Sequence, residues 1–117
     1  MTEAEVERMI RKDFHMMNKL ARLYCRSAKE ELDKIMQKYQ NAINRALDPD
    51  ERVIVYTYIT SGLSAEKLQY KVGVSTRSIW RIQGKATQKI AKYIIEQSRE
   101  HQIVWKQSRR CENEEIY

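Results

Sequence analysis

Apolar residues in the first 47 positions recur in steps of three and four, the spacing that keeps one face of a helix apolar. These positions are Val6, Ile10, Phe14, Met17, Ala21, Tyr24, Ala28, Leu32, Ile35, Tyr39, Ala42 and Ala46. Thr2 followed by Glu5 is a capping-box pair that would begin such a helix, and neither Gly nor Pro interrupts the segment. Residues 1–47 are therefore predicted to be helical.

This N-terminal segment is too long to form one helix inside a small core. Forty-odd residues at ~1.5 Å each would span roughly 65 Å. The apolar spacing slips at residues 28–32, where two steps of four follow each other. Two arrangements remain open: a helical hairpin that breaks near the slip, or a long helix that pairs with a second copy as a homodimer.

Residues 48–62 carry both a helix start and a helix stop. Asp48 suits the N-cap, Pro49 the first helical position, and Glu51 the position that closes a capping box. Residues 52–60 are rich in β-branched and aromatic residues, which on local propensity favour a strand. We predict a helix, because Gly62 is a good helix stop and no second strand-like run exists to pair with it.

Two shorter helical units follow. Ser64 would cap a helix over residues 65–72 that ends at Gly73, and Ser75 would cap a second helix that begins at Thr76. Apolar residues at the spacing of a helix-turn-helix would face the core from both helices and from the turn. These residues are Leu68, Val72, Val74, Ile79 and Ile82.

The inward isoleucines fix which residues of the second helix, residues 76–86, face outward. Such a recognition helix reads base edges in the major groove with its N-terminal residues. We predict base contacts from Thr76, Arg77, Trp80 and Arg81, and phosphate contacts from Ser64, Lys67, Lys71, Ser75, Lys85, Lys89 and Lys92. The alternatives are that Trp80 packs against the N-terminal helix and that the basic stripe is only a solvated face.

Charge is distributed unevenly along the chain. The formal net charge is +6, and residues 67–95 contain no Asp or Glu. Acidic residues gather in the N-terminal third and near the end, at Glu112, Glu114 and Glu115. Such segregation of sign points to a polyanionic partner on one face.

The same sequence argues against several classes of protein. It has no apolar run of eighteen residues and begins with an acidic segment that lacks a signal-peptide core, so we expect a cytoplasmic protein without a membrane partner. The cysteines and histidines are isolated, which predicts no metal site. No nucleophile–base pair, carboxylate cluster or phosphate-cradling glycine loop is present, so we expect neither an enzyme nor a cofactor.

Residues 47–52 (LDPDER) and 58–64 (YITSGLS) resemble the entry to region 4 of bacterial sigma factors. The runs VGVS at 72–75, IWR at 79–81 and KA at 85–86 continue the likeness, which covers residues 47–93. Within that superfamily the chain resembles late-gene transcriptional regulators of Gram-positive phages and prophages, of the autolysin-regulator type. One position departs from the pattern: Gln69 stands where such motifs carry a small residue, which predicts an outward side chain or a wider helix crossing.

We therefore expect an all-α chain in three parts: an N-terminal helical segment (1–47) for packing or oligomerisation, a sigma region 4-like helix-turn-helix module (48–97) and a polar C-terminal tail (98–117). The first hypothesis is a sequence-specific regulator of transcription, encoded by a phage or prophage, that binds double-stranded DNA and contacts RNA polymerase through another surface. The second is a module that binds polymerase or another protein. The third is a small terminase-like accessory of DNA packaging.

Overall fold

The computed structural model describes the backbone of residues 2–116 and the side chains of residues 2–98. The described backbone forms five helices and no strand, so the predicted all-α class is confirmed. The helices are α1 (Glu3–Ala21), α2 (Arg26–Ala46), α3 (Pro49–Ser61), α4 (Ala65–Val72) and α5 (Thr76–Ile116). α5 continues through the predicted polar tail, where side chains from residue 99 on lie outside the described ones.

Local signals set the helix ends. The Thr2 hydroxyl accepts a hydrogen bond from the Glu5 amide at 3.2 Å, and the Glu51 carboxylate accepts one from the Asp48 amide at 2.9 Å. The strand-like residues 52–60 lie within α3, as predicted. Gly62 ends this helix in the left-handed region at φ 72°, a conformation that glycine adopts without steric cost.

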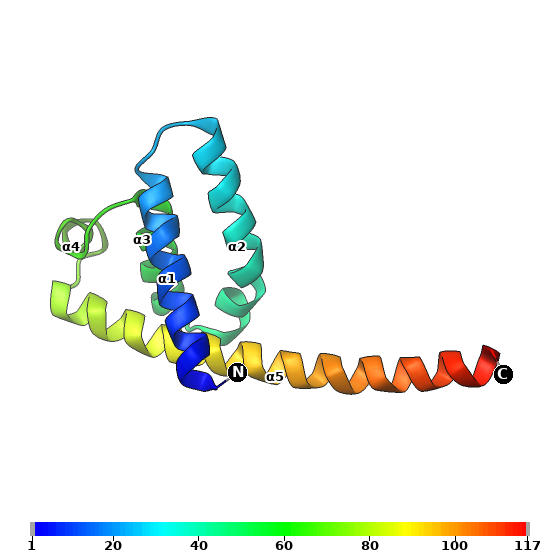
Figure 1. The fold of residues 1–117 in the computed structure, drawn as a ribbon. Helices are drawn as coiled ribbons and strands as arrows, with labels where there is room; N and C mark the ends of the chain where they lie inside the picture. Colours follow the sequence, from blue (N-terminus) through cyan, green and yellow to red (C-terminus); the bar gives the residue numbers. More distant parts are fainter. Residues whose placement is uncertain (1, 117) are drawn as a thin grey trace.

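The N-terminal segment folds as an antiparallel hairpin of α1 and α2 (Figure 1). The predicted position of the break was wrong: the chain reverses between the two helices, at residues 22–25, and Tyr24 is 100% exposed there. Ala28 and Leu32 both lie on α2, and the step of four between them keeps one face of that helix. The preceding step of four, from Tyr24 to Ala28, leads from the turn into α2.

Most of the apolar stripe of the hairpin is covered within the chain, while Tyr24 in the turn is exposed. Residues of α1, α2, α3 and α5 share one buried core, with partly buried side chains packed around it. Its buried members are Val6, Ile10, Phe14, Met17, Tyr39, Ala42, Ile43, Leu47, Val55, Ile59, Ala86, Ile90 and Ala91. These apolar residues therefore pack within the chain. A homodimer stays a prediction, but the face on which it was based is buried here.

Asn18 and Arg22 attach α1 to the end of α3. Asn18 is fully buried, and its Nδ2 donates to the carbonyl oxygens of Tyr58 at 2.7 Å and Leu63 at 3.1 Å. Arg22 donates from Nη2 to Asn18 Oδ1 and from Nε to the Gly62 carbonyl, both at 2.8 Å. Carbonyls at a helix C-terminus lack partners within the helix, so these side chains satisfy them and fix where the chain leaves for α4.

None of the described helices combines the length and the apolar composition that a membrane crossing requires.

Replacing Asn18 by Ala should lower the free energy of unfolding by about 2–3 kcal/mol, because the carbonyls of Tyr58 and Leu63 lose a buried donor. Urea denaturation of the parent and the variant measures the difference. Asn41→Ala on the exposed surface of α2 is the matched control and should change stability by less than about 0.5 kcal/mol. Equal effects of the two substitutions would show that the buried amide stabilises nothing.

Candidate functional site

α4 and the start of α5 form a pair of helices joined by residues 73–75. Gly73 has φ 74°, and hydroxyls cap both helices, as predicted. The Ser64 hydroxyl accepts from the Lys67 amide at 3.3 Å, and the Ser75 hydroxyl accepts from the Ser78 amide at 3.2 Å. Both helices therefore begin at the residues that their capping sequences predict.

A small separate core holds this pair against α3. Ile79 and Leu68 are both 0% exposed and lie in one cluster with Ile54 and Ala65. Val72, Val74 and Ile82 pack against the cluster as partly buried residues. All the apolar residues that were predicted to face inward are thus in this core, which fixes the rotation of α5 about its axis.

The opposite face of α5 carries the predicted arginines. Arg77 and Arg81 are exposed and flank a shallow depression together with Ser78. Lys85 and Lys92 are exposed further along the helix, and on α4 the lysines Lys67 and Lys71 are exposed as well. Among side chains of residues 2–98, none of these six cations forms an ion pair.

Thr76 lies at the edge of this face rather than on it. It is half-buried, and its hydroxyl donates to Gln69 Oε1 at 3.1 Å. Gln69, the residue that departs from the sigma-like pattern, therefore bridges α4 to the start of α5 through its amide. This contact engages the hydroxyl that was predicted to reach a base.

Trp80 combines features of both predicted arrangements. Its side chain lies beside α1, in a cleft that is also lined by Arg11 and His15, yet 55% of the residue is exposed. It thus borders the N-terminal helix and still presents an indole surface next to Arg81. Sequence reasoning missed Arg11 and His15 as neighbours of α5, because no local pattern reports which face of α1 packs against it.

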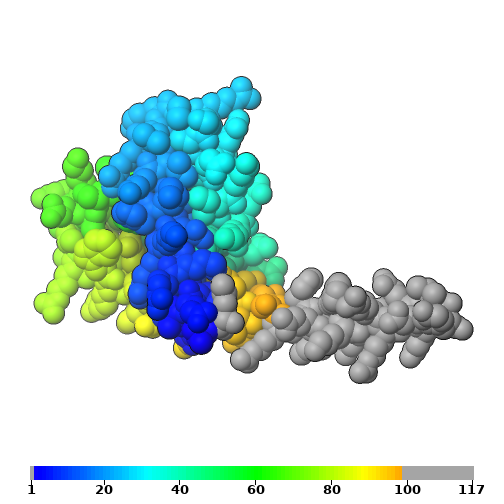
Figure 2. All heavy atoms as spheres, in the orientation of Figure 1, coloured from blue at the N-terminus to red at the C-terminus, as the bar shows by residue number. Residues whose placement is uncertain are grey.

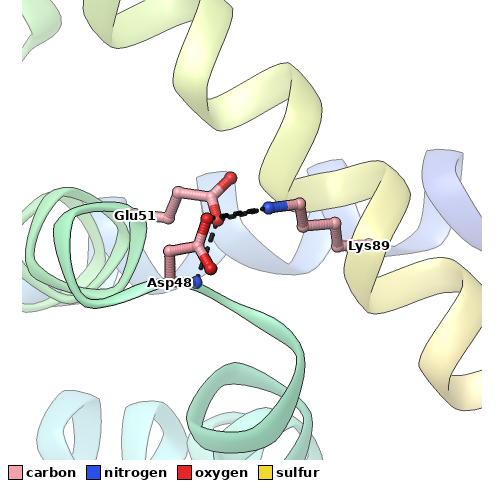
Figure 3. A network of polar contacts seen from close by, with 3 residues as sticks. All are labelled: Asp48, Glu51 and Lys89. Carbon is pink, nitrogen blue, oxygen red and sulfur yellow. Dashed lines mark hydrogen bonds and ion pairs between the residues drawn. The ribbon is translucent and has the colours of Figure 1, made fainter.

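Lys89 is not on the open part of the predicted stripe. Its Nζ lies 2.7 Å from Glu51 Oε1 and 3.3 Å from Asp48 Oδ2, at the start of α3 (Figure 3). The hydrogen bond with Glu51 raises the pKa of Lys89 above its ordinary value, and the nearby Asp48 carboxylate acts in the same direction. These ion pairs link α5 to the start of α3. Lys89 is therefore engaged within the protein and is not among the phosphate contacts proposed below.

Within residues 2–98 no group of three or more His, Cys, Asp or Glu side chains lies close enough to hold a metal ion. Cys25 is exposed and free, while Cys111 and His101 lie outside the residues whose side chains are described. The described site therefore offers cationic and hydrogen-bonding groups rather than a metal centre.

Comparison with known proteins gives no match: no protein-family model, no curated protein and no solved structure matches the chain.

Lys89→Met should lower stability at neutral pH, because it leaves the largely buried Glu51 carboxylate without its cationic partner. The folded pKa of Lys89 lies above its ordinary value of 10.5, so its contribution is complete below pH 10.5 and is lost as pH rises through the folded pKa. The stability difference between parent and variant should stay constant from about pH 7 to pH 9 and shrink above about pH 10.5.

Urea unfolding at each pH provides this comparison. Lys92→Met, which removes an exposed cation from the same helix, is the control and should show no such change with pH. A difference between parent and Lys89→Met that persists undiminished at high pH would contradict a role for the ammonium charge.

Proposed function

We propose that the chain is a sequence-specific regulator of transcription that binds duplex DNA with the first turns of α5 in the major groove. The observation that carries the proposal is the position of Arg77 and Arg81, exposed on the face of α5 opposite the fully buried Ile79. Recognition helices of helix-turn-helix proteins present their N-terminal residues to base edges in this way. The sigma region 4-like sequence of residues 47–93 supports the same reading.

The two arginines suit base recognition. They lie four residues apart, so their side chains project from neighbouring turns of the same helix face. A guanidinium can donate two parallel hydrogen bonds to O6 and N7 of guanine, and each good pair discriminates against other bases by about 1–3 kcal/mol. The absence of a described carboxylate partner leaves both guanidinium groups available for this contact.

The lysines supply the sequence-independent part of the affinity. Lys67 and Lys71 on α4 and Lys85 and Lys92 on α5 are exposed, and no acidic residue interrupts residues 67–95. Cations of this kind contact phosphates, fix the register of the protein on the duplex and release bound counterions. Ser64, exposed at the start of α4, adds a hydroxyl donor for the same backbone. The Ser75 hydroxyl donates to Ser78 Oγ at 3.0 Å, so the start of α5 offers its amide donors instead.

On this proposal the chain acts as a phage or prophage late-gene regulator, which the resemblance of its α3–α5 sequence supports. A second candidate is a module that binds RNA polymerase or another protein. Its support is an apolar hollow beside the α1–α2 connection, lined by Leu20, Leu32 and the exposed side chains of Leu23 and Tyr24. A regulator that contacts polymerase would use both surfaces.

Arg81→Ala should weaken binding to a selected duplex by about tenfold to a hundredfold and relax the preference at one base pair. The site is first obtained by selection from random duplex DNA with the parent protein. Fluorescence anisotropy with that site and with single-base variants then measures the loss. If Arg77→Ala and Arg81→Ala both bind the selected site as tightly as the parent does, this recognition surface is wrong.

The affinity for DNA falls as salt rises, and Lys85→Gln should make this fall shallower. The slope of log affinity against log salt concentration should decrease in magnitude by about 0.9, the value for one lost phosphate contact. Lys89→Gln is the matched comparison: it removes the same charge four residues later, but its ammonium is engaged by Glu51. The second variant should leave the salt slope unchanged. A salt slope that is reduced equally in both variants would indicate that the net charge of the protein, and not the position of the lysine, determines the affinity.

A further inference from the structure

A cleft of about 330 Å³ separates α1 from α5 beside the face that carries Arg81. Arg11 and His15 of α1 form one wall, and Trp80, Gln83, Gly84 and Thr87 of α5 form the other. Phe14 and Tyr58 complete the lining, so no carboxylate faces the cleft. In the space-filling view the first turns of α5 (yellow-green) adjoin α1 (blue) on the same side of the molecule (Figure 2).

The polar groups of the cleft are mainly donors. The Arg11 guanidinium carries a permanent positive charge with five N–H donors, and it forms no ion pair among residues 2–98. The Gln83 side-chain nitrogen is buried without a hydrogen-bond partner. A buried donor without an acceptor is costly, so a rotation that turns the Gln83 amide toward a ligand oxygen in the cleft would be favoured. An anion with several oxygens fits this set of groups.

Gly84 leaves the wall of the cleft without a side chain. It lies inside α5, where glycine weakens a helix relative to alanine, and a Cβ built on it would meet no atom of the chain within 4 Å. Packing within the protein therefore does not require glycine at this position. A bare backbone on the wall of an open cleft instead permits the close approach of an external group.

We propose that this cleft is a phosphate-binding subsite, occupied by a backbone phosphate of the DNA whose bases Arg77 and Arg81 read. The inference rests on the proposed function and deepens it, because it adds α1 to the DNA-contacting surface. Trp80 and Arg81 are consecutive on α5, about 100° apart around the helix, so the cleft opens beside the base-reading face. Arg11 donates to the phosphate, His15 adds an imidazole donor, and Gly84 allows the sugar–phosphate backbone to approach α5.

The position of the cleft favours a DNA phosphate over free phosphate. Inorganic phosphate and a DNA backbone phosphate offer the same oxygens, but only the duplex would span the cleft and the exposed arginines at once. Trp80, 55% exposed at the cleft, would then contact the sugar next to that phosphate. The experiment must therefore separate the two sources.

Arg11→Ala should weaken binding to the selected duplex about fivefold, equivalent to the loss of one net hydrogen bond, and should lower the salt slope by about 0.9. Lys12→Ala is the matched control: it removes the same charge from the next residue of α1, which is exposed but does not line the cleft. It should leave the slope unchanged. Equal losses in both variants would overturn the subsite.

Gly84→Ala tests the same subsite by adding a methyl group to its wall. This variant should unfold at no lower temperature than the parent, because alanine is a better helix former and the methyl meets open space. It should nevertheless weaken DNA binding about fivefold, as the backbone can no longer approach as closely. DNA affinity equal to that of the parent would argue against close approach at Gly84 and overturn this part of the proposal.

Titration with inorganic phosphate separates the two sources. In a Trp105→Phe background Trp80 is the remaining tryptophan, and its fluorescence is followed with potassium chloride of equal ionic strength as the reference. A saturable change that Arg11→Ala abolishes, together with a DNA salt slope that Arg11→Ala leaves unchanged, would assign the cleft to free phosphate and overturn the DNA source. No saturable change and no effect on the slope would overturn the anion site altogether.

The Arg81→Ala measurement keeps this inference separate from the proposed function. Loss of base preference in Arg81→Ala with unchanged binding in Arg11→Ala would leave DNA recognition standing and reject the subsite. A parent protein that selects no duplex would reject both the proposed function and the DNA source, whatever the phosphate titration shows.

Discussion

The burial of Ile79 against Leu68 determines the orientation of α5, and the outer face of that helix follows from it. Consecutive helical residues are separated by about 100°, so a side chain fixed in the core assigns every other residue of the same helix to a direction. Arg77 and Arg81 face outward because Ile79 faces inward, and Trp80 lies at the border between the two. A rotation of α5 by two residues, about 200°, would bring Arg77 or Arg81 to the place of Ile79 and bury a guanidinium in an apolar cluster, which costs far more than an exposed isoleucine.

Contacts at both ends of α3 hold the α4–α5 pair in place. Asn18 and Arg22 satisfy the carbonyls at the end of α3 and so direct the chain into α4. At the other end of α3, the carboxylates of Glu51 and Asp48 form ion pairs with Lys89 of α5. The helix pair is therefore anchored through both ends of α3. The N-terminal segment, which the sequence left open between packing and pairing with a second chain, forms part of the same core.

Features that depend on a few neighbouring residues were predictable from the sequence. Helix starts at Ser64 and Ser75 and the turn at Gly73 are set by caps and a positive φ, which act over three or four positions. Contacts between residues far apart in the chain were not. Periodicity identified the apolar face of α1, but it could not place Arg11 and His15 opposite Trp80, nor turn the chain at Tyr24, because these depend on how the hairpin crosses α5.

Lys85 and Lys89 show why a charge pattern alone does not define a binding surface. They are identical residues one turn apart on α5, yet Lys85 is exposed and Lys89 is bonded to Glu51. The basic stripe is consequently interrupted at Lys89, with Lys85 and Lys92 exposed on either side. Arg11 lies beside the first turns of the helix, so the cationic surface also extends sideways over α1. On the proposed function, a duplex would contact α1, α4 and the first turns of α5. The N-terminal hairpin would then contribute to DNA affinity as well as to folding.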